Sequence, residues 1–334
     1  ECDGVLARVQ EALATPIVLA DGTAVQLSAS IGVRTAPPLP EEADTLLREA
    51  DQALYIAKRD GRARVHRFDA EDARLEQQRS ARINEVAEAL RHDGMCLHFQ
   101  PIVDLETGQA SHLEALVRWR KPDGGLVPPG DWLPVIEHTP VIVDLGRWVL
   151  REALDACNRW QAALPGLGVS VNVSARELCS PAFATDVAEA LARHPGLPPG
   201  RLLLEVTESA PMSALPAALA TMNACRALGV EFALDDFGTG YSSLTYLKLL
   251  PVSIVKLDRS FIAHLDESLD DQRIVRGIVQ LVEGSGLRVV AEGIETAAQA
   301  REVLAAGCLL GQGFGLARPA PEATVLERLA TPPR

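Results

Sequence analysis

The sequence of 334 residues lacks any closely spaced pair of cysteines. Its six cysteines are scattered along the chain, at Cys2, Cys96, Cys157, Cys179, Cys225 and Cys308. A disulfide scaffold or a zinc knuckle needs clustered cysteines, so reduced cytosolic thiols are the simpler interpretation. The seven histidines show no His-Glu-x-x-His spacing, which removes the common zinc-protease motif.

Positive charge is also scarce. Lysine and arginine total 32 against 45 aspartates and glutamates, which gives a net charge of −13. General binding to nucleic-acid polymers needs a basic surface, and an anionic membrane would repel this chain. The longest uncharged stretches, 209–225 and 303–317, are interrupted by Pro or Gly and too short for a bilayer span. With no signal peptide and no initiator Met, we expect a cytoplasmic fragment; an upstream membrane anchor stays open.

What is present is ordinary globular composition, with 47% hydrophobic and 23% charged residues. Residues 1–68 hold a strand-like run at 25–33, a proline-rich break at 37–40 and an amphipathic helix pattern at 41–58. A highly charged helical pattern at 69–92 predicts a connecting helix.

From residue 95 onward, short apolar runs alternate with helical patterns. The runs cover 96–103, 111–119, 168–173, 201–206, 230–234, 253–257, 287–291 and 308–314. Continuous apolar runs are typical of parallel strands buried on both faces. Eight of them over about 240 residues fit an α/β barrel better than an open sheet.

Polar residues lie within these runs or just after them. They are Glu114, Asn172, Glu205, Glu208, Asp235, Asp236, Lys256, Asp258, Glu292, Glu295 and Gln312. Taken singly, an acid after a strand is most often a helix cap or turn residue, and a lysine can extend to solvent. Because the carboxyl ends of barrel strands converge on one mouth, we expect these side chains to meet.

Several carboxylates cannot share a small site without cations, because like charges disfavour ionisation. Oxygen ligands of carboxylate and amide type suit Mg²⁺ or Mn²⁺ rather than zinc. The neighbours Asp235 and Asp236 can bridge two metals, an arrangement used in phosphoryl-ester hydrolysis.

Over about residues 80–330 these motifs resemble the EAL domain family, the bacterial hydrolases of cyclic di-GMP. The resemblance is carried by Glu114-Ala-Leu-Val-Arg118-Trp119, Phe99-Gln100-Pro101-Ile102, Val171-Asn172-Val173-Ser174, Glu205-Val-Thr-Glu208, Asp235-Asp236-Phe-Gly-Thr-Gly, Val255-Lys256-Leu257-Asp258, Ala291-Glu292-Gly293-Ile294-Glu295 and Gly311-Gln312-Gly313-Phe314. It implies an α/β fold, a modified TIM-type (β/α)8 barrel with one antiparallel strand.

The resemblance also implies roles for individual residues. The metal ligands would be Glu114, Asn172, Glu205, Asp235 and Asp236; the catalytic residues would be Lys256, Glu292 and Glu208; and Gln100, Leu116, Arg118 and Gln312 would contact cyclic di-GMP. Two Mg²⁺ or Mn²⁺ ions are expected as cofactors, with Ca²⁺ inhibiting, and a homodimer through the barrel is expected. One departure is Pro140, in Glu137-His138-Thr139-Pro140, where the family usually has Gly.

The N-terminal segment resembles the C-terminal half of a GGDEF (diguanylate cyclase) domain. The matching residues are Ser28-Ala-Ser-Ile-Gly-Val33 and Leu46-Leu-Arg-Glu-Ala-Asp51-Gln-Ala-Leu-Tyr55. The family's signature turn is absent, so no cyclase activity is expected. The resulting division is a partial α+β remnant at 1–68, a connecting helix at 69–92 and a phosphodiesterase barrel at 93–330.

The leading hypothesis is metal-dependent hydrolysis of cyclic di-GMP to linear 5′-pGpG. A catalytically silent cyclic di-GMP receptor is the alternative, although every mapped metal position is intact. A third hypothesis is an unrelated barrel, such as an enolase-like lyase that also gathers carboxylates on Mg²⁺. A metal titration with cyclic di-GMP separates them.

Overall fold

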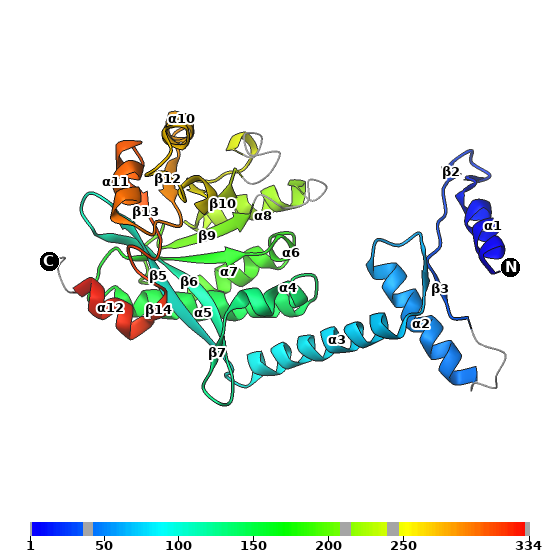
Figure 1. The fold of residues 1–334 in the computed structure, drawn as a ribbon. Helices are drawn as coiled ribbons and strands as arrows, with labels where there is room; N and C mark the ends of the chain where they lie inside the picture. The colour runs from blue at the N-terminus through cyan, green and yellow to red at the C-terminus, as the bar shows by residue number, and fades with distance from the viewer. Residues whose placement is uncertain (1, 36–42, 208–214, 239–246, 331–334) are drawn as a thin grey trace. The chain divides into compact units, whose positions relative to one another are not determined.

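The computed structural model describes residues 2–35, 43–207, 215–238 and 247–330 (Figure 1). The chain divides into two compact units, Glu1–Asn84 and Glu85–Arg334. The division falls within the long helix α3 (Ala70–Arg91), which forms where the charged helical pattern predicts it. In the described part of the chain, no helix is long and apolar enough to cross a membrane.

Besides the first part of α3, the described residues of the first unit form two helices and two small sheets. Its elements are α1 (Cys2–Ala14), β1 (Ile17–Val18), β2 (Ala24–Val25), β3 (Ile31–Val33), α2 (Ala43–Arg59) and β4 (Val65–Arg67). The pair β1–β2 is antiparallel and β3–β4 is parallel. The helix expected at 41–58 is confirmed as α2. The continuous strand expected at 25–33 is wrong, because only β2 and β3 find partner strands.

The second unit is built on a closed barrel of eight strands. They are β5 (Met95–Asp104), β6 (Ala110–Arg120), β8 (Gly168–Val173), β9 (Leu202–Thr207), β10 (Glu231–Phe237), β11 (Ile254–Leu257), β12 (Arg288–Ala291) and β13 (Leu310–Gly311). Neighbours pair in the order β5, β13, β12, β11, β10, β9, β8, β6, and pairing of β6 with β5 closes the ring. Each of the eight expected apolar runs overlaps one of these strands.

One barrel strand runs against the rest. Strand β5 is antiparallel to both of its barrel neighbours, β6 and β13, whereas the other barrel pairs are parallel. The expectation of a modified barrel with one antiparallel strand is therefore confirmed. Two short strands extend the sheet beside β5 and β6, namely β14 (Ala320–Pro321) and β7 (Leu126–Val127).

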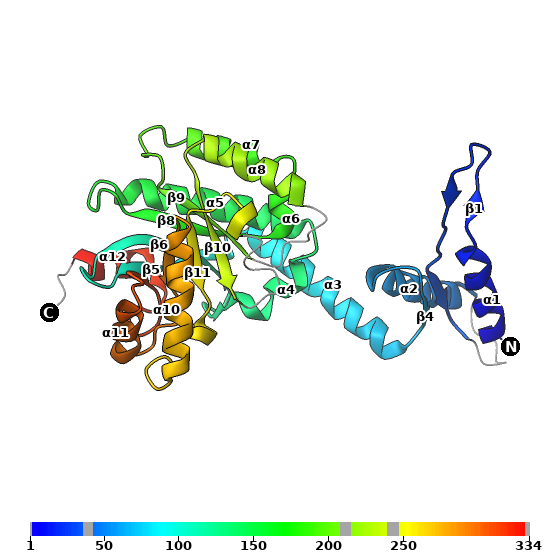
Figure 2. The same ribbon diagram turned by 90° about the horizontal axis from the view of Figure 1, so that it is seen from above.

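Helices cover the outside of the barrel (Figures 1 and 2). The described ones are α4 (Leu133–Ile136), α5 (Val141–Trp160), α6 (Ala175–Leu178), α7 (Phe183–Ala192), α8 (Leu215–Ala227), α10 (Leu269–Gly284), α11 (Ala297–Ala305) and α12 (Glu322–Ala330), with 3-10 turns η1 (Pro129–Asp131) and η3 (Arg259–Phe261). Helix α5 shows why they pack: Ile142, Leu145 and Val149 recur at helical spacing and are buried. At its end, Trp160 meets Phe99 of β5 edge-to-face, with ring centroids 5.1 Å apart.

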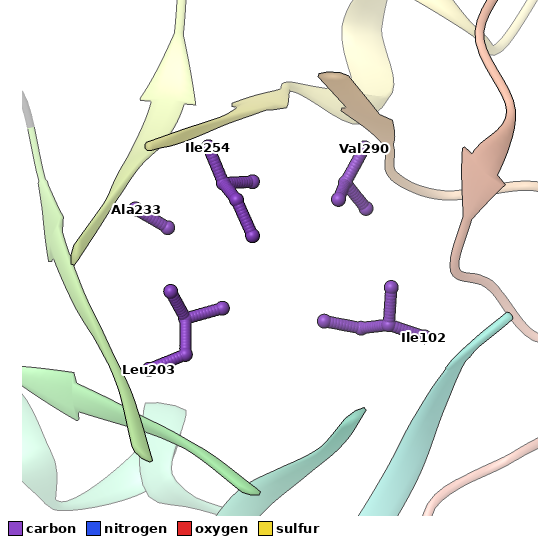
Figure 3. Packing of buried hydrophobic residues seen from close by; sticks show 5 residues of the cluster. All are labelled: Ile102, Leu203, Ala233, Ile254 and Val290. Atoms are coloured by element: carbon purple, nitrogen blue, oxygen red, sulfur yellow. The ribbon is translucent and has the colours of Figure 1, made fainter. Parts of the chain in front are cut away.

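A ring of apolar side chains fills the barrel interior. Figure 3 shows them pointing toward one another, each from a different strand. They are Ile102 of β5, Leu203 of β9, Ala233 of β10, Ile254 of β11 and Val290 of β12. Because side chains alternate along a strand, the residue two positions further toward the mouth also points inward. The next layer of inward-pointing side chains therefore lies directly above the apolar ring, on the side of the mouth.

Candidate active site

The layer above the apolar ring is polar. Each of the eight barrel strands supplies one member, from within the strand or just past its end: Gln100, Glu114, Asn172, Glu205, Asp235, Lys256, Glu292 and Gln312. On four parallel strands the polar residue lies two positions after the apolar one, as Glu205 does after Leu203. On the reversed strand β5 it lies two positions before, since Gln100 precedes Ile102. The structure therefore gathers these predicted residues into one layer.

A break in strand pairing explains how two neighbouring aspartates can both line the mouth of the barrel. In a regular strand, Asp235 and Asp236 would point to opposite faces. The register between β10 and β11 shifts between Leu234 and Phe237, and Asp236 has a φ of 53°. This left-handed conformation is uncommon outside glycine, although aspartate tolerates it better than most residues. The bulge lets both carboxylates line the same cavity.

Lys256 lies at the centre of the polar layer. Its side chain is 1% exposed, and its Nζ lies 2.6 Å from Glu205 Oε2, 2.7 Å from Glu292 Oε1, 3.3 Å from Asp235 Oδ1 and 3.7 Å from Glu114 Oε2. One ammonium thus contacts four carboxylates in a water-poor environment. Burial lowers the pKa of Lys256, but the four carboxylates outweigh burial and raise it well above its ordinary value. The lysine is therefore charged.

The carboxylates outnumber the positive charge available to them. Burial raises the pKa of Glu292 to about 7 against the lowering effect of Lys256, and neighbouring acids add to the rise. Burial likewise raises the pKa of Glu205 well above its ordinary value. Burial and the charges of Asp235 and Asp258 raise the pKa of Asp236. All three shifts have the sign expected of a site that needs additional cations.

The donor set fits divalent metal ions. Carboxylate oxygens of Asp235, Asp236 and Glu292 lie within 4.8 Å of one another. Glu205 Oε1 is buried without a hydrogen-bond partner, so it has a lone pair directed at no donor. Asn172 Nδ2 donates to Glu114 Oε1 at 2.7 Å, which brings the remaining two predicted ligands together. Such an all-oxygen set suits Mg²⁺ or Mn²⁺.

The polar layer opens into a cavity of about 330 Å³. Its lining includes Asp258 and Glu295, which the sequence analysis expected at the mouth without giving them a specific role. It also includes four residues that the sequence analysis did not expect at the mouth, Arg259, Gly293, Gly313 and Phe314. These four closely follow the carboxyl end of a barrel strand, which is the signal that could have marked them. Gly293 has a φ of 71°, and a Cβ there would lie 2.4 Å from Arg259 Cβ, so only glycine fits.

Other predicted residues lie elsewhere. Leu116 and Arg118 follow Glu114 on the same face of β6 and are half-buried, but they are not among the described residues that line this cavity. Arg118 donates to the carbonyl of Val117 at 2.8 Å. Glu208 and the loop 239–244 lie outside the described residues.

Two family models match segments of the chain. The family model "EAL domain" matches residues 83–319, which is well over half of the chain. The model "Diguanylate cyclase, GGDEF domain" matches residues 2–64. The two matches cover the two segments in which the sequence resembles these families.

Curated relatives share both segments. The chain is 40% identical over 307 residues to "Bifunctional diguanylate cyclase/cyclic di-GMP phosphodiesterase MucR" of Pseudomonas aeruginosa, covering 92% of this chain and 45% of that protein. It is 38% identical over 323 residues to "Cyclic di-GMP phosphodiesterase NbdA" of the same organism, covering 96% of this chain and 41% of that protein. The chain thus spans less than half the length of either relative.

A solved structure shares the barrel. "PaMucR Phosphodiesterase, c-di-GMP complex" matches with a TM-score of 0.69 and 41% identity, covering 73% of this chain and 99% of that one. Together with the family model, the relatives and the gathered polar layer, this match leads to one conclusion: the chain belongs to the EAL domain family.

Proposed function

We propose that the second unit hydrolyses cyclic di-GMP to linear 5′-pGpG with the help of two divalent cations. The observation that carries this proposal is the set of four carboxylates around the Lys256 ammonium at the mouth of the barrel. The names of the relatives MucR and NbdA, and of the solved complex, point to the same substrate.

The cations would be held by the carboxylates and the amide of the polar layer. Glu114, Asn172, Glu205 and Asp235 would hold one ion, and Asp235 with Asp236 would hold the other; we propose Mg²⁺ or Mn²⁺. Two such ions supply electrostatic stabilisation to the attacking and leaving oxygens of a phosphodiester.

Lys256 and Glu292 would handle the attacking water. Nζ of Lys256 and Oε1 of Glu292 are 2.7 Å apart, close enough for one water to contact both groups. The Lys256 ammonium orients the water and stabilises negative charge at the phosphate. Glu292, whose pKa burial raises to about 7, can accept the water proton near neutral pH. The P–O bond to the 3′ oxygen breaks as the water oxygen bonds to phosphorus.

The substrate side of the proposal rests on fewer contacts. Arg118 carries the cation suited to a phosphate and lies farther along β6 than Glu114. Leu116 stands between them on the same strand face. Gln100 and Gln312 line the cavity. Glu208 is proposed to hold the loop after Asp236, and this role rests on its position in the sequence alone.

A product assay tests the function. The chain is incubated with cyclic di-GMP and Mg²⁺, Mn²⁺ or Ca²⁺, and pGpG is separated by chromatography. We expect turnover with Mg²⁺ or Mn²⁺ and little with Ca²⁺, which prefers more ligands at longer distances. Binding without turnover would favour the silent receptor, and no binding would favour an unrelated barrel.

We further propose that two copies associate through the barrel unit and that the reaction is cytoplasmic. The outer face of α10 supports association, because Ile274 and Leu281 are about half exposed and lie, with Ile278 between them, on one side of the helix. Light scattering after size-exclusion chromatography would give the mass, and Ile274→Glu should shift a dimer to monomer.

A further inference from the structure

Two buried glutamines form a hydrogen-bonded chain that ends on Glu114. Gln312 Nε2 donates to Glu114 Oε2 at 2.7 Å and lies 3.3 Å from Gln100 Oε1, which accepts its second hydrogen. Gln100 Nε2 donates in turn to the carbonyl of Ala317 at 2.9 Å. Gln100 is 7% exposed and Gln312 is 4% exposed. The chain therefore runs from a backbone carbonyl to a carboxylate without solvent between its members.

The hydrogen bonds around Glu114 show the direction of this chain. Glu114 Oε2 accepts from Gln312 Nε2 at 2.7 Å, and a carboxylate oxygen is a hydrogen-bond acceptor. Both hydrogens of that nitrogen are then used, one on Glu114 and one on Gln100. Gln100 consequently presents its oxygen to Gln312 and its nitrogen to Ala317. Reversing either amide would place two acceptors face to face.

Glu114 is thereby held at both of its oxygens. Asn172 Nδ2 donates to Oε1 and Gln312 Nε2 donates to Oε2, each at 2.7 Å. A carboxylate with a donor on each oxygen is fixed in its rotation as well as its position. Hydrogen bonds of this kind to ligating residues set the affinity of protein metal sites.

We propose that Gln312 and Gln100 are positioning residues that act on cation binding through Glu114. This inference rests on the proposed function, since it assigns Glu114 to a metal ion. It goes beyond the expectation that both glutamines contact cyclic di-GMP: both amide hydrogens of Gln312 have partners within the protein, and its Oε1, buried without a hydrogen-bond partner, is the atom left for another contact. Gln100 acts only through Gln312, as the second link of the chain.

The test measures Mn²⁺ binding to the full chain by calorimetry in the absence of any dinucleotide. Loss of a hydrogen bond to a metal ligand costs about 10- to 100-fold in affinity, so Gln312→Leu should raise the Kd for Mn²⁺ at least tenfold. Gln100→Leu should raise it less, by roughly threefold, because Gln312 keeps its direct bond to Glu114. The double variant should match Gln312→Leu alone, because the outer link acts only through the inner one.

The matched control is Gln161, whose amide is also engaged but at the opposite end of the barrel. Its Nε2 donates to the carbonyls of Cys157 and Leu167. Gln161→Leu should lower the melting temperature while leaving the Kd for Mn²⁺ unchanged. Where Gln312→Leu does not fold, Gln312→Met keeps more of the side-chain volume. Gln100→Leu is an independent test of the inference, because a residue that contacts only the dinucleotide would not alter Mn²⁺ binding.

Three results would overturn the inference while the proposed function stands: an unchanged Kd for Mn²⁺ in the folded Gln312 variant, an unchanged Kd in the Gln100 variant, or additive effects in the double variant. Failure of the unsubstituted chain to bind Mn²⁺ would instead overturn the proposed function, and this inference with it.

Discussion

At the scale of single residues, the polar layer holds more carboxylates than one lysine can neutralise. Lys256 contacts four carboxylates, so three negative charges remain uncompensated when all four acids are ionised. Burial is the main cause of the raised pKa values of Glu205 and Glu292, and the neighbouring acids add to both rises. Divalent cations would neutralise the remaining negative charges, and the Lys256 ammonium would then be available to contact the attacking water.

Lys256→Met tests the proposal that Lys256 takes part in the reaction while the cations neutralise the carboxylates. We expect kcat to fall by about 10²-fold or more, the effect of losing one electrostatic stabiliser. Binding of cyclic di-GMP should change much less, because the metal ligands and Arg118 remain. The measurements are kcat by product assay and Kd by calorimetry in Ca²⁺. Near-normal kcat, or equal losses in both quantities, would remove Lys256 from the catalytic residues.

The backbone at Asp236 allows a second test that needs no activity. Its φ of 53° suits glycine and strains alanine. Asp236→Gly and Asp236→Ala remove the same carboxylate, so they differ mainly in backbone cost. We expect the glycine variant to be more stable by about 1 kcal/mol, measured by urea unfolding. In ordinary strand or helix positions an alanine variant is more stable than the glycine variant. If Asp236→Ala were the more stable variant here, that result would contradict a left-handed conformation at position 236.

At this scale the sequence could predict the identity of the gathered residues but not all of their geometry. Polar residues at the ends of apolar runs share one mouth in any barrel, which explains the placement of Glu205 and Glu292. Strict alternation would have turned Asp236 away from Asp235. The bulge that corrects this depends on pairing with β11, which is set by residues some twenty positions away.

At the scale of elements, the turn from β8 to α6 contains a buried capping box. The Glu177 carboxylate accepts hydrogen bonds from Ser174 N at 2.9 Å and Ser174 Oγ at 2.6 Å, and Ser174 Oγ accepts one from Glu177 N. Such carboxylates usually lie at the surface, but Glu177 is 4% exposed. Burial raises its pKa to about 7 against the lowering effect of Ser174.

This shift gives stability a defined pH dependence. A carboxyl group whose folded pKa is raised from 4.5 to about 7 binds a proton more tightly in the folded state. Its contribution is complete below pH 4.5 and is lost as pH rises through 7. At 1.36 kcal/mol per unit, the loss is about 3 kcal/mol. Glu177→Gln should therefore lose less stability than the original chain between pH 5 and pH 8, measured by urea unfolding. Parallel pH profiles would contradict the shift.

Packing of α5 against the same side chain predicts an unusual glycine effect. A Cβ at Gly146 would lie 1.5 Å from Glu177 Oε1. Alanine normally stabilises a helix interior by about 1 kcal/mol relative to glycine, but we expect Gly146→Ala to destabilise by about 2 kcal/mol or more. In a Glu177→Ala background the same change should become neutral or stabilising. A double-mutant cycle by thermal unfolding measures this, and additive effects would show that the two side chains do not collide.

The elements themselves were largely predictable, because eight apolar runs separated by helical patterns leave few alternatives to a barrel. The strand expected at 25–33 was wrong because pairing is a long-range property: β3 pairs with β4 and β2 with β1, and residues between them have no partner strand. The reversal of β5 came from the family resemblance, yet the sequence holds a physical signal for it. The runs at 96–103 and 111–119 are too close for a parallel crossover, which needs a dozen or more residues.

At the scale of the whole molecule, the two units can be observed separately. All four tryptophans of the sequence, Trp119, Trp132, Trp148 and Trp160, belong to the second unit. Mg²⁺ that binds only the folded barrel stabilises it by mass action, by about 2.7 kcal/mol at 100 times the Kd. We expect Mg²⁺ to raise the melting temperature seen by tryptophan fluorescence, and EDTA to reverse the rise. An unchanged transition with Mg²⁺ well above millimolar would contradict a metal site in the barrel.

The direction of β5 also decides where the chain enters the barrel. Met95 pairs with Trp119 near the carboxyl end of β6, so β5 begins on the side of the mouth and runs away from it. The last turn of α3 reaches this same side, where Gly94 accepts a hydrogen bond from Arg120 N and Glu85 lies 3.9 Å from Lys121. In a barrel with eight parallel strands the preceding segment would attach at the far rim. Here α3 instead joins the barrel on the side of the mouth, so a displacement of α3 enters the barrel at the mouth end of the strand that carries Gln100.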